Sequence, residues 1–118
     1  MRETVWSVGD LLKEVGSLLE QGFSGLRVEG EVTNVSRSGR GHLYFSLKDE
    51  AAQMDCVMWA SAARRLPFDL EDGLAVLAVG SLTIYPARGR FQMVVTGLDP
   101  QGQGALQLAF EQLKRKLS

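Results

Sequence analysis

The order of apolar and polar residues predicts a helix near the start of the chain. Between residues 8 and 21, apolar side chains recur every three or four positions, which is the spacing of one helix face. Ser7 precedes this segment as a candidate N-cap, and Asp10 lies three residues after Ser7, where a capping carboxylate is expected. Gly22 is a candidate stop for the helix. The apolar stripe comprises Val8, Leu11, Leu12, Val15, Leu18 and Leu19. We therefore expect an amphipathic helix over residues 8–21.

From Leu26 onward the apolar positions alternate, which predicts strands, because side chains two residues apart in a strand lie on the same face. The clearest strand is 43–48, where Leu43, Phe45 and Leu47 occupy one face. Residues 74–79 are apolar throughout, which predicts a strand buried on both faces, and Gly80 then marks a bulge or bend. The five expected strands cover residues 26–33, 43–48, 53–59, 74–84 and 91–96.

The remaining segments predict two more helices and a fold class. A short helix is expected over residues 61–66, ending before Pro67, and an amphipathic helix over residues 105–117. Five strands with a short helix between the third and the fourth follow the order of an OB-fold barrel. We therefore predict a mainly β fold with three parts: an N-terminal helical extension (1–25), a five-stranded OB-fold barrel (26–98), and a connector with a C-terminal helix (99–118).

Two short loops combine glycine with arginine. Residues 37–42 are Arg-Ser-Gly-Arg-Gly-His and residues 86–90 are Pro-Ala-Arg-Gly-Arg, and each loop lies between two alternating segments, as a hairpin tip does. Either loop alone is most simply a soluble turn. In an OB-fold, however, the loops joining strands one to two and four to five line the binding groove. Because guanidinium groups fit phosphate oxygens, the pair predicts a cationic rim for a nucleic-acid strand.

The predicted interface combines phosphate contacts, stacking and hydrogen bonds. Tyr44 lies on the outward face of strand 43–48 and is expected to stack on a base. Trp59 is a second aromatic candidate, but covering the edge of the core is the preferred interpretation for it. The expected phosphate contacts are Arg37, Arg40, Arg88 and Arg90, with Arg64 and Arg65 as further candidates, and the expected hydrogen-bonding groups are His42, Ser46 and Gln92.

Composition limits the other classes of function. Thirteen basic and fourteen acidic residues give a net charge of −1, so binding to a polyanion depends on where the charges fall. The single cysteine, Cys56, excludes an internal disulfide, and no segment approaches the ~20 apolar residues of a membrane span. With no signal peptide at the start, we expect a cytoplasmic protein without a membrane contact. One histidine and no phosphate-binding, dinucleotide or catalytic-triad motif predict no cofactor, no metal and no catalytic residue here.

Several stretches also carry a family resemblance. They are Val28-Glu-Gly-Glu-Val-Thr-Asn34, Gly41-His-Leu-Tyr-Phe-Ser-Leu-Lys-Asp-Glu50, Cys56-Val-Met-Trp59, Asp72-Gly73, Tyr85-Pro-Ala-Arg-Gly-Arg-Phe-Gln92 and Gly104-Ala-Leu-Gln-Leu-Ala-Phe-Glu-Gln-Leu-Lys-Arg-Lys-Leu117. Together they resemble the N-terminal domain of the exodeoxyribonuclease VII large subunit, from the first helix to the last.

The resemblance implies a bacterial nuclease that degrades single-stranded DNA into oligonucleotides. In that family the N-terminal OB-fold is understood to bind DNA, hydrolysis belongs to a following domain, and several small subunits associate with the large one. The resemblance therefore implies a DNA-binding segment without catalytic residues, joined to the small subunit through parts of the parent chain that are not present here.

Two alternatives stay open. The first is a protein-interaction or self-association module that uses residues 74–79 or the apolar stripe of the last helix, which comprises Leu106, Ala109, Phe110, Leu113 and Leu117. The second is an RNA-binding OB-fold, which the family resemblance disfavours and the physics does not.

Overall fold

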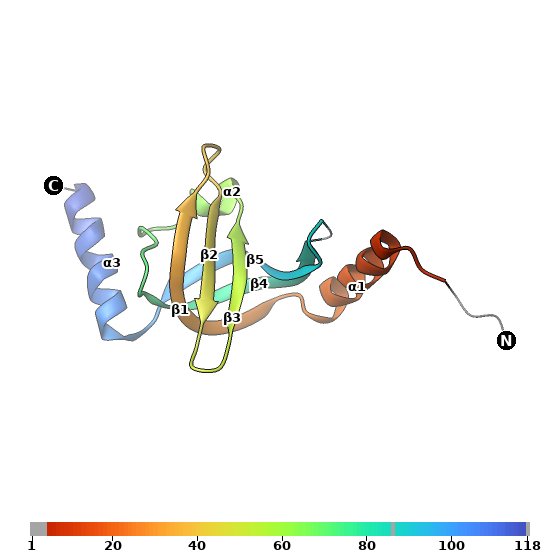
Figure 1. The fold of residues 1–118 in the computed structure, drawn as a ribbon. Helices are drawn as coiled ribbons and strands as arrows, with labels where there is room; N and C mark the ends of the chain where they lie inside the picture. The colour runs from red at the N-terminus through yellow and green to blue at the C-terminus, as the bar shows by residue number, and fades with distance from the viewer. Residues whose placement is uncertain (1–4, 86, 118) are drawn as a thin grey trace.

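The computed structural model describes residues 5–85 and 87–117, apart from the side chains of residues 103–105. Along the chain its elements are α1 (Val8–Gly22), β1 (Leu26–Arg37), β2 (Leu43–Lys48), β3 (Gln53–Met58), α2 (Ala60–Ala63), β4 (Ala75–Tyr85), β5 (Arg90–Pro100) and α3 (Gly102–Leu117). The strands close into a barrel in the order β1-β2-β3-β5-β4, and β4 pairs back with β1 (Figure 1). Neighbouring strands are antiparallel except β3 and β5. The predicted OB-fold barrel is therefore confirmed.

The inward-facing apolar side chains of the strands form the core. In β2, Leu43, Phe45 and Leu47 are buried, and they pack with inward side chains from every other strand. The segment after α2 covers one end of the barrel, since Phe68 and Leu70 join the same cluster. Core members from the other strands are Val32, Cys56, Met58, Val76, Ala78, Met93, Val95 and Leu98.

The bend expected at Gly80 is confirmed. The β4–β5 register shifts between Val79 and Gly80, and a Cβ atom added at Gly80 would collide with the carbonyl group of Val94. Only glycine therefore allows the two strands to approach each other here. The expectation that residues 74–79 are buried on both faces is wrong in part: Val76 and Ala78 are buried, whereas Leu77 and Val79 are half-buried and Ala75 is exposed. The outward face of this segment is therefore partly exposed, as in an antiparallel sheet with one solvated face.

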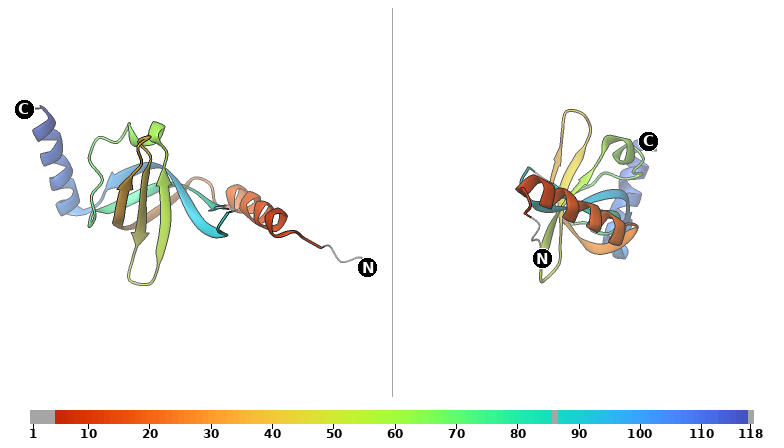
Figure 2. Two further views of the ribbon diagram at one scale, coloured as in Figure 1. Left: turned by 45° about the horizontal axis from the view of Figure 1, so that its top comes forward. Right: turned by 90° about the vertical axis from the view of Figure 1, so that its right-hand side faces the viewer.

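The two long helices leave the barrel at opposite ends (Figure 2). The predicted N-cap of α1 is confirmed, because the Ser7 hydroxyl accepts a hydrogen bond from the Asp10 amide at 3.0 Å. Gly22 is still helical, and Phe23 forms the C-cap. The amide of Leu82 donates to the carbonyl of Phe23 at 3.0 Å, which fixes the end of α1 against β4. Within the described part of the chain, no helix is long and apolar enough to cross a membrane.

The predicted connector before the last helix is shorter than expected. Strand β5 continues to Pro100, which pairs with Val76, and the Gln101 amide donates to Ala75 O at 2.8 Å. Proline is tolerated here because it ends the strand. Helix α3 then begins at Gly102, one turn before the predicted start at residue 105. Pro100 thus ends the strand and Gly102 begins the helix, so the segment does not form a long loop.

Candidate nucleic-acid interface

The outward face of β2, β3 and β5 forms a shallow hollow. In the β2–β3 hairpin Ser46 lies opposite Asp55 and Tyr44 lies opposite Val57, while Gln92 of β5 lies beside Asp55. The strand register therefore brings Tyr44, Ser46 and Gln92 to one surface, as predicted. The hollow has a volume of about 370 Å³ and is lined by Asn34, Tyr44, Phe45, Ser46, Gln53, Asp55, Cys56 and Gln92.

The three predicted groups on this face differ in accessibility. Tyr44 is 39% exposed, which leaves its side chain accessible for stacking. Gln92 is half-buried. Ser46 is only 5% exposed, because this small residue lies between Thr33 and Asp55 in the register. Ser46 is thus at the floor of the hollow and has less freedom to hydrogen-bond a ligand than the sequence suggested.

The first basic loop is a tight turn above this face. Ser38 donates to His42 O at 2.9 Å, and its hydroxyl accepts from the His42 amide at 3.1 Å. Gly41 has a φ of 88°, a conformation that suits glycine. Arg37 ends β1 and Arg40 lies at the tip; both are exposed, and neither has an ion-pair partner among the described residues. Both guanidinium groups are therefore available to a ligand.

His42 has a structural contact that the sequence only suggested. Its Nδ1 accepts a hydrogen bond from the amide of Ala60 at 2.9 Å, which ties the loop to the start of α2. Its ring meets the ring of Trp59 edge-on, with centroids 5.1 Å apart. Since Nδ1 is an acceptor, Nε2 carries the proton and can donate to a phosphate or a base.

The second basic loop joins β4 to β5 and lies beside α1. The amides of Arg88 and Gly89 donate to Tyr85 O at 3.1 and 2.8 Å, and a Cβ atom at Gly89 would lie 3.7 Å from Leu12 of α1. Arg88 is exposed, and Pro86 lies outside the described residues. Arg90 is also exposed, but its Nη1 lies 4.0 Å from Oδ2 of Asp55. Arg90 therefore partly neutralises the only carboxylate that lines the hollow.

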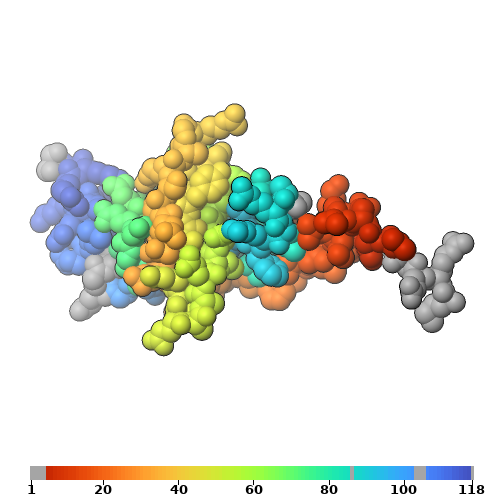
Figure 3. All heavy atoms as spheres, in the orientation of Figure 1, coloured from red at the N-terminus to blue at the C-terminus, as the bar shows by residue number. Residues whose placement is uncertain are grey.

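The two basic loops border the same face from different sides. The β1–β2 loop lies above β2 and β3, and the β4–β5 loop lies beside them (Figure 3). Arg64 and Arg65 are exposed directly after α2, at the end of the barrel that carries the β1–β2 loop (Figure 1). They do not line the hollow. The arginines thus surround the face rather than converge on one point.

Two residues of this face were not in the predicted site. Met54, Cys56 and Met58 point inward, so the alternation of β3 places Asp55, Val57 and Trp59 outward. Asp55 pairs with Arg90, and Trp59 contacts His42. The sequence signal was present, because the same alternation that identified the core also identifies its opposite face.

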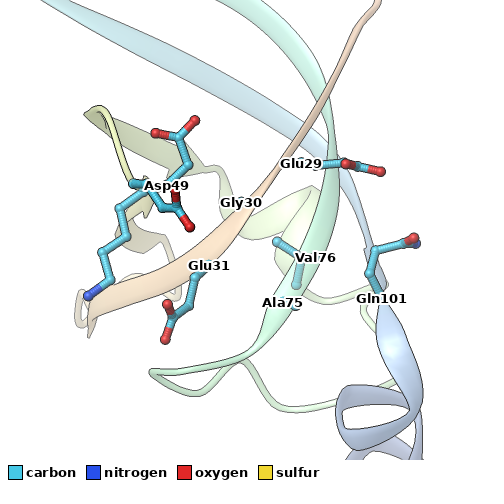
Figure 4. Close-up of a pocket in the computed structure, with 9 residues that line it drawn as sticks. Glu29, Gly30, Glu31, Asp49, Ala75, Val76 and Gln101 are labelled. Carbon is cyan, nitrogen blue, oxygen red and sulfur yellow. The ribbon is translucent and has the colours of Figure 1, made fainter.

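Acidic residues gather in a different hollow, of about 690 Å³, at the β2–β3 turn and the first half of β1 (Figure 4). Glu29, Glu31 and Asp49 are exposed there, as expected for solvated carboxylates. Hydrogen bonds from the Ala51 and Ala52 amides lower the pKa of Asp49. Among the described residues, no group of three or more His, Cys, Asp or Glu side chains is placed so that it could hold a metal ion.

Cys56 does not offer a reactive thiol. It is buried, and burial raises the pKa of its thiol from the usual 9.0 to about 12. Because the thiolate is the nucleophilic form, Cys56 is unreactive at neutral pH and serves as a core residue.

Comparison with solved structures supports the architecture. One match is a replication protein A heterotrimer bound to single-stranded DNA, with a TM-score of 0.55 and 18% identity over 80% of this chain and 72% of that one. Another is the second OB-fold domain of replication protein A from Methanococcus maripaludis, with a TM-score of 0.52 and 14% identity over 67% of this chain and 85% of that one. At such identities the likeness shows the fold alone.

Comparison with curated proteins confirms the resemblance seen in the sequence. The exodeoxyribonuclease 7 large subunit of Rhodopirellula baltica is 52% identical over 94% of this chain and 25% of its own length. That of Koribacter versatilis is 50% identical over 96% of this chain and 25% of its own length. The chain therefore spans about a quarter of these relatives. Residues 6–99 match the family described as OB-fold nucleic acid binding domain, and the chain belongs to that family.

Proposed function

We propose that this chain binds single-stranded DNA across the outward face of β2, β3 and β5. The observation that carries the proposal is the exposed Tyr44 ring above a shallow hollow, bordered by two loops with exposed arginines. A flat aromatic ring accepts any base, and guanidinium groups hold phosphates without reading sequence. Binding is therefore expected to show little sequence preference.

Each predicted residue except Arg64 and Arg65 has a defined part in this proposal. Arg37 and Arg40 contact phosphates on one side of the face, and Arg88 and Arg90 do so on the other. Tyr44 stacks on a base, and His42 donates a hydrogen bond from Nε2. Gln92 bonds base edges from within the hollow, and Ser46 contributes only at its floor.

In the full-length protein, the domain would deliver DNA to a catalytic domain. The name of the relatives, exodeoxyribonuclease 7 large subunit, and the quarter of their length that this chain spans support this role. We propose that hydrolysis to oligonucleotides and association with the small subunit belong to the remainder of such a protein. The chain itself would then bind DNA without cleaving it.

Fluorescence anisotropy of labelled oligonucleotides tests the proposal. A single strand should bind at low salt and dissociate as salt rises, because each phosphate contact releases counterions. A duplex of the same length should bind more weakly, since its bases are not available for stacking. Equal affinity for the duplex, or binding that is insensitive to salt, would contradict the proposal. A matched RNA strand distinguishes DNA binding from the alternative RNA function.

Self-association is a second candidate, and the surface of α3 favours it. Its side toward the barrel presents Leu108, Ala109 and Gln112, whereas Leu106, Phe110, Leu113 and Leu117 are exposed. Light scattering after size exclusion tests this possibility. A stable oligomer that does not bind DNA would favour it over the DNA-binding proposal.

A further inference from the structure

Trp59 extends the outward face beyond the hollow. It directly follows β3, where its backbone is still extended, with φ −65° and ψ 154°, and it forms the N-cap of α2. The alternation of β3 therefore continues to Trp59 and places it on the same side as Asp55 and Val57. The contact between Trp59 and His42 confirms this placement, because His42 precedes β2 as Trp59 follows β3.

The ring of Trp59 is held in place and remains accessible. Its edge-on contact with His42 has an interplanar angle of 83°, and His42 is itself fixed by the bond from Ala60. The residue is 44% exposed, slightly more than Tyr44. A large aromatic ring that is both oriented and exposed loses little conformational freedom when a base stacks on it.

The residue between the two rings in β3 is covered. Val57 lies opposite Tyr44 and is fully buried, although it lies outside the main core cluster. The row of His42 and Trp59 is two residues farther along the hairpin, which corresponds to roughly 7 Å at the rise of a β-strand. Tyr44 and Trp59 are thus exposed aromatic residues in neighbouring outward rows of the hairpin, and the buried Val57 adds no surface between them.

We propose that Trp59 is a second base-stacking subsite, so that the bound strand follows the β2–β3 hairpin toward α2. This inference rests on the proposed function. Arg64 and Arg65 follow Trp59 by about one turn of α2, and both are exposed without an ion-pair partner in the described part of the chain. They supply the phosphate contacts at this end, which gives a role to two arginines that do not line the hollow.

Intrinsic fluorescence offers a direct test, because the chain has two tryptophans. In a Trp6→Phe variant, Trp59 is the only tryptophan that reports. Titration with an oligothymidylate of about 16 nucleotides, at the upper end of an OB-fold footprint, should quench this fluorescence. The quenching should have the same midpoint as the anisotropy of the labelled strand.

Substitutions then separate stacking from folding. Trp59→Leu should weaken binding about ten-fold, as expected for the loss of one stacked base, whereas Trp59→Tyr should retain most of the affinity. Trp6→Leu is the matched control, because Trp6 is 48% exposed but precedes α1. It should bind as the unmodified chain does. Circular dichroism and thermal melting identify any variant that fails to fold. If Trp59→Leu does not fold, the conservative variant Trp59→Tyr is compared with the unmodified chain instead.

The outcomes are distinguishable. If anisotropy reports binding but Trp59 fluorescence does not change and Trp59→Leu binds as the parent does, the subsite is overturned while the DNA-binding proposal stands. If no oligonucleotide binds at low salt, the DNA-binding proposal fails and the subsite fails with it.

Discussion

At the scale of single residues, Tyr44 has the clearest consequence. Its ring is exposed and its neighbours on the sheet are polar or fully buried, so the fold does not need it as a core residue. Tyr44→Ala should weaken single-strand binding by about 1–3 kcal/mol, the range measured for stacked bases, and Tyr44→Phe should bind almost normally. Anisotropy gives the affinities, and unchanged circular dichroism shows that the fold is intact. Normal affinity of Tyr44→Ala would remove this ring from the site.

Asp55 should oppose the binding of DNA. Its carboxylate lies in the hollow and attracts Arg90 at 4.0 Å. Asp55→Asn removes a negative charge beside the phosphates and releases Arg90, so affinity should rise several-fold at low salt, and the gain should shrink as salt screens the charges. Asp99→Asn is a control, since Asp99 lies at the far end of β5. A loss of affinity in Asp55→Asn would show instead that Asp55 positions Arg90 for its contact.

Cys56 gives the barrel a dependence on alkaline pH. Burial raises the pKa of its thiol to about 12, above the usual 9.0 that it regains in the unfolded chain. The contribution to stability is therefore complete below pH 9 and is lost as pH rises toward 12, because only the unfolded chain ionises readily. Urea unfolding at several pH values should show this loss, and Cys56→Val should show less of it. An identical pH profile in the variant would contradict the assignment.

At the scale of elements, one buried side chain holds α3 to the barrel. Gln112 is buried, its Oε1 accepts from the Asp69 amide at 2.7 Å, and its Nε2 donates to the Asp69 carbonyl at 3.3 Å. Gln112→Ala would leave both backbone groups without these partners, at a cost of about 1–3 kcal/mol for each one that stays buried.

Hydrogen exchange should therefore be faster in α3 of Gln112→Ala, with little change in the strands. Gln107→Ala is the matched control, because Gln107 is exposed and, among the described residues, its side chain bonds only to Glu111 of its own helix, at 3.3 Å. Unchanged exchange in Gln112→Ala would show that other contacts hold the helix.

The sequence predicted β2 and α1 to within one residue, whereas β1 and β5 continue four residues beyond their predicted ends and α3 begins three residues early. Strand alternation depends on which residues enter the core, so Leu43, Phe45 and Leu47 identified β2 correctly. The stripe of α3 was a poorer guide, because the barrel-facing contact uses Gln112, whose burial depends on a backbone 43 residues away in the sequence. Similarly, the ion pair of Asp55 with Arg90 arises from the parallel pairing of β3 and β5, which no local pattern predicts.

At the scale of the whole molecule, charge is separated although the net charge is only −1. Arginines border the face of β2, β3 and β5, while Glu29, Glu31 and Asp49 gather at the other hollow. A DNA strand is therefore attracted to one face and repelled from the acidic region, although the protein as a whole is not strongly basic. The sequence placed the basic loops correctly at two hairpin tips; their spacing around the face depended on barrel closure.

This separation predicts how the two loops share one strand. The dependence of affinity on salt should lose about 0.7 in logarithmic slope for each phosphate contact removed from a single strand. Arg40→Ala tests the first loop and Arg88→Ala the second. Arg27→Ala is the control, because Arg27 is exposed in the half of β1 that pairs with β4.

If one strand contacts both loops, each single variant should lower the slope and the double variant should lower it by the sum, since distant sites act additively. A normal slope in one single variant would show that its loop lies outside the path. A lower salt slope in Arg27→Ala would place the DNA strand on the opposite part of the barrel. The additive result requires a strand long enough to pass both loops, so a shorter oligonucleotide should lose one of the two effects.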